Sequence, residues 1–194
     1  QIAACVRHHP ETRRTVCGFL DDSVPMSEEV LGRTSDLAHL ARKKFVDEII
    51  SKYGRIDVAV LTVGGYAAGD ISETKTSDIA KQYKLNFETA YNIARPAFMQ
   101  MKKQSHGRIF IIGSRPGIDA RNGRGMVAYG LAKSLLFRLA DLLNDEAKGL
   151  DIVASVVVPS TIDTEANRKA LPLADFNSWV KAEQIARVIN YYSS

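Results

Sequence analysis

The stretch Arg108-Ile-Phe-Ile-Ile-Gly-Ser-Arg-Pro-Gly117 decides the fold, because a short apolar run ends there in a turn that contains proline and glycine. Two more runs have the same form. Residues 58–63 stop at Gly64, and residues 151–158 stop at Pro159. Short runs that are mostly apolar are typical of strands buried on both faces, as in a parallel sheet. We therefore expect three adjacent parallel strands.

Helical patterns flank these runs. They cover residues 37–53, 77–103, 125–147 and 182–191, and Pro96 should bend the second or mark a seam in it. Alternating strands and helices predict a doubly wound α/β fold. The first 35 residues allow two readings: a strand over 2–6 that ends at Arg7, which we favour slightly, or a strand over 15–20 that ends at Asp21.

Composition excludes several classes of protein. The 194 residues are 45% hydrophobic and 25% charged, which is ordinary for one globular domain and excludes general disorder. The net charge of only +4 argues against nucleic-acid binding. No apolar run is long enough for a membrane span, and no signal peptide is visible. Cys5 and Cys17 have no zinc spacing, so we expect no metal site and a cytoplasmic location.

Tyr129 and Lys133 are the first candidate catalytic pair. They are four residues apart in a predicted helix and therefore share a face. A phenol is a poor proton donor or acceptor near neutral pH, and a nearby ammonium group lowers its pKa. Such a pair suits acid–base chemistry on an alcohol or a carbonyl. The same spacing also occurs by chance on helix surfaces.

Three more residues give this pair a context. Ser114 follows a buried strand at its carboxyl end, where ligands of open α/β sheets bind, although turns often contain serine as well. Gly64 would allow a ligand close to the backbone, or it is a plain turn residue. Asn86 is a poor helix former inside a helix, which indicates a hydrogen-bonding role or a solvated face.

At this point the chain resembles the short-chain dehydrogenase/reductase family. The supporting segments are Gly54-Arg-Ile-Asp57, Gly64, Asn86, Ser114, Tyr129-Gly-Leu-Ala-Lys133 and Pro159-Ser-Thr-Ile-Asp-Thr164, in this order. The resemblance implies a Rossmann-like NAD(P)-dependent oxidoreductase that reduces a carbonyl or oxidises an alcohol. Several stretches, among them Asp163–Trp179, resemble the dihydropteridine reductase branch, which usually lacks the catalytic serine.

The resemblance assigns a role to each matching residue. Tyr129 is the acid or base, Lys133 lowers its pKa and holds the nicotinamide ribose, Ser114 orients the carbonyl, and Asn86 supports a water relay. Asp36 and Leu37 match the turn that contacts adenine, and Ile162 and Thr164 match the loop at the nicotinamide and the phosphates. The cofactor choice depends on the early strand: Arg7 suits the 2′-phosphate of NADP, and Asp21 suits the ribose of NAD.

The chain also departs from the family pattern. The glycine-rich cofactor motif after the first strand is absent, and no strand follows the last helix. We therefore expect residues 1–194 to form a single Rossmann-like domain that is incomplete at both ends, with the first and last strands missing. A slot should then separate the early strand from residues 58–63.

Two other expectations concern function and assembly. The main alternatives to a carbonyl reductase are a dihydropteridine reductase-like enzyme and a non-catalytic binding protein on the same fold. The helices over 77–103 and 125–147 are more apolar than one sheet face requires. We expect a homodimer or homotetramer that acts on a small molecule. Arg115, Arg121 and Arg124 in the loop before Tyr129 suit an anionic substrate, the cofactor phosphates or a solvated loop.

Overall fold

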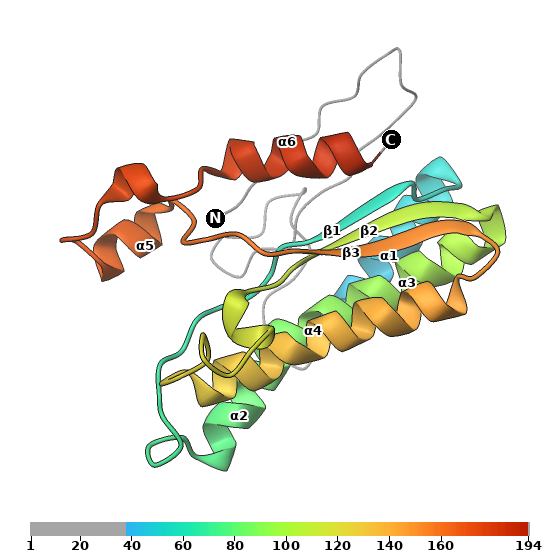
Figure 1. Ribbon diagram of the computed structural model, residues 1–194. Coiled ribbons are helices and arrows are strands. Elements are labelled where there is room, and N and C mark those ends of the chain that lie inside the picture. Colours follow the sequence, from blue (N-terminus) through green and yellow to red (C-terminus); the bar gives the residue numbers. More distant parts are fainter. Residues whose placement is uncertain (1–37, 194) are drawn as a thin grey trace.

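A three-stranded parallel sheet forms the centre of the computed structural model, which describes residues 38–193 (Figure 1). The strands are β1 (Val58–Leu61), β2 (His106–Ile112) and β3 (Asp151–Val157), in the order β1-β2-β3. Val58 pairs with Arg108, and Ile109 pairs with Ala154. The predicted parallel neighbours are thus confirmed. The early strand with its slot, Arg7, Asp36 and Leu37 lie outside the described residues.

Helices cover both faces of this sheet. Helices α3 (Thr89–Gln104) and α4 (Val127–Glu146) lie along one face, and α1 (Ala38–Tyr53) packs against α3. Helix α6 (Ala182–Tyr192) lies over the other face (Figure 1). This arrangement is the predicted Rossmann-like α/β fold. No helix within residues 38–193 has both the length and the apolar character that a membrane span requires. The other helical elements are α2 (Thr76–Gln82), η1 (Tyr83–Glu88), η2 (Arg115–Gly117), α5 (Glu165–Ala170) and η3 (Phe176–Ser178).

The sequence predicts one helix over residues 77–103 with a bend or seam at Pro96, but the observed irregularity lies elsewhere. Helix α3 continues through Pro96, whereas the preceding residues Tyr83–Glu88 form a π-helix. A π-helix carries more residues per turn than an α-helix and is frequent at functional sites. The change in helix geometry therefore lies at η1 and not at the proline, and the buried residue Asn86 is part of it.

The burial of β2 explains why apolar and polar residues do not alternate in its sequence. Ile109 and Ile111 belong to one buried cluster, with residues of α3 and α4. Phe110 and Ile112 belong to a second cluster, with Ile185 of α6 and its neighbours. Successive side chains of a strand point to opposite faces, so both sets are apolar when both faces are covered.

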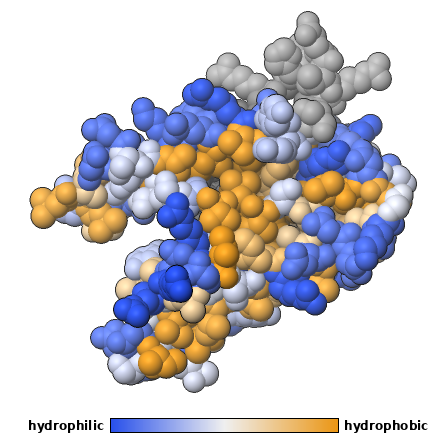
Figure 2. Space-filling model, in the orientation of Figure 1, coloured by the Kyte–Doolittle hydropathy of each residue, from blue (hydrophilic) through white to orange (hydrophobic). Residues whose placement is uncertain are grey.

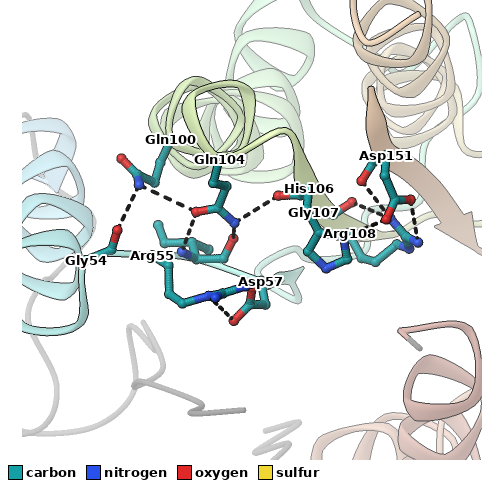
Figure 3. A network of polar contacts seen from close by, with 10 residues as sticks. Gly54, Arg55, Asp57, Gln100, Gln104, His106, Gly107, Arg108 and Asp151 are labelled. Carbon is teal, nitrogen blue, oxygen red and sulfur yellow. Dashed lines mark hydrogen bonds and ion pairs between the residues drawn. The ribbon is translucent and has the colours of Figure 1, made fainter. Parts of the chain in front are cut away.

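Gln104, the last residue of α3, joins the amino ends of two strands (Figure 3). Its Nε2 donates to the carbonyl oxygens of Ile56 (2.7 Å) and His106 (2.8 Å), and its Oε1 accepts from the Ile56 N–H (3.2 Å). Nearby, the Asp151 carboxylate contacts the His106 ring and forms an ion pair with Arg108. These contacts tie the amino ends of the strands together, at the edge opposite to the carboxyl ends.

Replacing Gln104 with methionine should lower the free energy of unfolding by about 1–3 kcal/mol, because the partly buried Ile56 backbone would lose both partners. Urea unfolding measures the change. Lys103→Met, at an exposed neighbouring position, is the control and should change stability little. Equal stability of the two variants would contradict a structural role for Gln104.

Candidate active site

Lys133 and Tyr129 lie one turn apart on α4, next to the carboxyl end of β2. Lys133 is 5% exposed, and its Nζ donates to the carbonyl oxygen of Ile112, the last residue of that strand, at 2.9 Å. The same Nζ lies 5.9 Å from the centre of the Tyr129 ring. The predicted pair therefore faces the edge of the sheet where ligands bind in such folds.

Asn86 lies in the π-helix η1 and is completely buried. Its Oδ1 accepts from the Gly65 N–H at 3.1 Å, and its Nδ2 donates to the Gly65 carbonyl at 3.0 Å and to Gln82 Oε1 at 2.8 Å. Of the two predictions for Asn86, the hydrogen-bonding role is correct and the solvated face is wrong. The side chain fixes the backbone that follows β1.

Gly64 lets Asn86 and Lys133 approach the same point. A Cβ atom on Gly64 would lie 2.7 Å from Asn86 Oδ1 and 3.1 Å from Lys133 Nζ. Any side chain here would therefore displace one of these polar groups. The structure gives Gly64 a steric role that the sequence did not reveal.

Ser114 joins this group from the end of β2. It is 9% exposed, and among the described residues its hydroxyl has no hydrogen-bond partner. The turn η2 that follows is pressed against α4: a Cβ on Gly117 would lie 2.8 Å from the Lys133 carbonyl carbon, and one on Gly130 would lie 3.1 Å from the Pro116 oxygen. A buried hydroxyl without a partner is unfavourable, and a ligand oxygen would satisfy it.

Burial raises the pKa of Tyr129, which is the opposite of the predicted lowering by Lys133. The Ser114 hydroxyl favours the phenolate, although it forms no well-aligned hydrogen bond, and the Tyr66 phenol raises the pKa of Tyr129 further. Burial also lowers the pKa of Lys133 to about 8. The reason for the correction is desolvation, which disfavours the charged form of both groups. Tyr129 is therefore a neutral phenol near pH 7.

Tyr66 is a member of the site that sequence analysis missed. Its ring meets the Tyr129 ring edge-on, with 5.4 Å between the centroids, and two thirds of Tyr66 is exposed. The available signal was an aromatic residue directly after Gly64-Gly65, at the carboxyl end of a buried strand. Such a position faces the ligand edge of the sheet.

Ile162 and Thr164 lie at the end of the loop between β3 and α5. Thr164 caps α5 by accepting from the Asn167 N–H at 3.2 Å, and Ile162 forms a bridge with Val180. Within the described residues, no hydrogen bond or ion pair links either residue to Tyr129 or Lys133. In residues 38–193 there is also no group of three acidic, histidine or cysteine residues that could hold a metal ion.

Comparison with known proteins identifies the family. The model of the short chain dehydrogenase family matches residues 2–173. The cyclic-di-GMP-binding biofilm dispersal mediator protein of Escherichia coli (strain K12) is 32% identical over 163 residues, which are 84% of this chain and 67% of that protein. The dihydropteridine reductase of Dictyostelium discoideum is 25% identical over 156 residues, 78% of this chain and 65% of that protein.

Solved structures share the fold at low sequence identity. ElxO with NADP bound matches with a TM-score of 0.73 at 23% identity, over 86% of this chain and 72% of that one. NAD+-bound xylitol dehydrogenase matches with a TM-score of 0.69 at 18% identity, over 80% and 69%. The match covers 67% of the biofilm dispersal mediator protein and 65% of the dihydropteridine reductase, so this chain spans about two thirds of the length of these two relatives. Because the family model covers most of the sequence, the chain belongs to the short-chain dehydrogenase family.

Proposed function

We propose that the protein is an NAD(P)-dependent oxidoreductase that reduces a carbonyl group or oxidises the corresponding alcohol. One observation carries the proposal: the buried, unpaired Ser114 hydroxyl lies at the same edge as the neutral phenol of Tyr129 and the buried amine of Lys133. The structures of relatives with NADP and with NAD+ bound support this class of cofactor.

Each residue has one task in this reaction. A bound reduced nicotinamide would supply the hydride to the carbonyl carbon. The Ser114 hydroxyl donates a hydrogen bond to the carbonyl oxygen, and Tyr129 gives its phenolic proton to that oxygen. Protonated Lys133 then stabilises the phenolate that remains. Asn86 holds the Gly65 backbone and, with Lys133, would order water for the return of the proton.

The described residues fit the nicotinamide half of such a cofactor. An orphaned hydroxyl at Ser114 and the exposed backbone of Gly64 leave polar groups and space for a ligand at the sheet edge. Lys133, Tyr129, Ile162 and Thr164 would hold the cofactor, as the family resemblance implies. Arg7, Asp36 and Leu37 stay predictions, and so does the choice between NADP and NAD.

The experiment is a titration of the full chain with NADPH and with NADH, followed by assays of carbonyl reduction on aldehydes, ketones and a quinonoid dihydropterin. We expect dinucleotide binding and turnover of at least one class. Preference for the dihydropterin would favour the dihydropteridine reductase alternative, which the relative in Dictyostelium discoideum and the exposed Tyr66 ring support. Absence of dinucleotide binding would favour a non-catalytic protein on the same fold.

We also propose that the protein assembles as a homodimer or homotetramer and works in the cytoplasm. On α4, Leu131, Leu135 and Leu142 are exposed on one side of the helix, and α3 exposes Tyr91 and Met99. Exposed apolar residues that gather on neighbouring helices mark contact surfaces. Light scattering of the full chain should give at least a dimeric mass, and Leu135→Glu should lower it. A monomeric mass for the unaltered chain would contradict the proposal.

A further inference from the structure

A loop with three arginines lies directly on the catalytic helix. It runs from η2 to Met126 and is held at both ends (Figure 1). At its start, Pro116 and Gly117 are pressed against Gly130 and the backbone of Lys133. At its end, the Gly69 N–H donates to Gly125 O at 2.8 Å and the Val127 N–H donates to Gly69 O at 2.9 Å. The loop therefore keeps a defined place beside the turn that carries Tyr129.

Within the described residues, Arg115, Arg121 and Arg124 of this loop have no acidic partner. The acid of the same loop, Asp119, is occupied by Asn122, whose N–H donates at 3.0 Å and whose Nδ2 donates at 2.7 Å. All three arginines are exposed, so this edge of the site has cationic groups that the described part of the chain does not neutralise.

Two acidic residues that follow β3 also form ion pairs within their own segment. Asp163 pairs with Arg168 at 2.6 Å, and Glu165 pairs with Lys169 at 2.6 Å. Figure 2 shows a hollow between the part of the molecule that carries α5 and the part that carries α2, with hydrophilic residues along its border. The arginine loop lies beside this hollow and contributes three exposed positive charges to it.

Ser114 is the candidate catalytic residue that lies next to the arginine loop in the sequence. It directly precedes Arg115, and among the described residues its buried hydroxyl has no hydrogen-bond partner. The Arg115 side chain is exposed and long enough to reach a substituent of a substrate whose carbonyl oxygen lies at Ser114 and Tyr129. Guanidinium groups bind carboxylates and phosphates through paired hydrogen bonds. We propose that the substrate carries an anionic group, a carboxylate or a phosphate, next to its carbonyl, and that Arg115, aided by Arg121 and Arg124, selects it. This inference rests on the proposed function.

A matched pair of probes tests the proposal. Phenylglyoxylate is a 2-oxo acid, and its methyl ester has the same carbonyl without the charge. Calorimetric titration of the full chain with NADP+ present measures binding without turnover. We expect the acid to bind about tenfold tighter than the ester, and Arg115→Gln to remove that preference while the affinity for the ester stays unchanged. Competition by acetate or by inorganic phosphate distinguishes a carboxylate site from a phosphate site.

Arg138→Gln is the matched control, because Arg138 lies on the same helix as Tyr129 but more than two turns away, beside Asp141. It should leave both affinities unchanged. Equal binding of acid and ester by the unaltered chain would overturn the proposal. An equal loss of affinity for both probes in Arg115→Gln would also overturn it. A loss of affinity for NADP+ alone would overturn it too, because it would assign the arginines to the cofactor phosphates. Arg115-dependent binding of the acid, with no NADPH-dependent turnover of either probe or of the aldehydes, ketones and dihydropterin above, would support the anion site and contradict the proposed reduction.

Discussion

Replacing Tyr129 with phenylalanine should lower the rate of carbonyl reduction by about 10²–10⁴-fold while the protein stays folded. The substitution removes the proton that the neutral phenol would donate and keeps the ring that packs edge-on against Tyr66. Steady-state kinetics measure the rate, and urea unfolding confirms that the fold is intact.

Tyr53→Phe is the control for this substitution. Tyr53 is the last residue of α1, is exposed and loses the same hydroxyl group. Its kinetics should match those of the unaltered chain. Normal turnover in a folded Tyr129→Phe variant would remove Tyr129 from the catalytic role and leave only the fold assignment.

Replacing Lys133 with methionine should abolish most turnover and change how stability depends on pH. In the folded protein the pKa of Lys133 is lowered from 10.5 to about 8. Between these values the unfolded chain binds more protons than the folded chain, so the free energy of unfolding rises as the pH rises. The rise due to this lysine is about 3 kcal/mol in full, and it is complete only above about pH 10.5.

The Lys133→Met variant should lack this rise, because methionine does not titrate. Urea unfolding at a series of pH values between 7 and about 10.5 measures the difference from the unaltered chain. Lys148→Met is the control, because Lys148 is exposed and pairs with Asp145 at the surface. Parallel curves for the unaltered chain and Lys133→Met would show that Lys133 keeps an ordinary pKa in the folded protein.

The elements with the clearest apolar patterns were predicted well. All three buried runs form neighbouring parallel strands, and the helix that carries Tyr129 and Lys133 begins and ends within two residues of its predicted bounds. These predictions succeed because short, mostly apolar runs are typical of strands inside a parallel sheet. Burial on both faces holds best for β2, whereas β3 leaves Asp151 and Val153 exposed. The π-helix at η1 was missed, because its sequence continues an ordinary helical pattern and its position depends on contacts with Gly65 and Gln82.

The site shows the same division. The sequence alone determined that Tyr129 and Lys133 share a helix face and that Ser114 ends a buried strand, because helix periodicity and strand ends are local properties. Only the tertiary structure decided that Gly64 admits Asn86 and Lys133 to one point, that the Ser114 hydroxyl is buried without a partner, and that the pKa of Tyr129 is raised. The reason is that desolvation and close contact arise from atoms that distant segments bring together, and no local pattern in the chain records them.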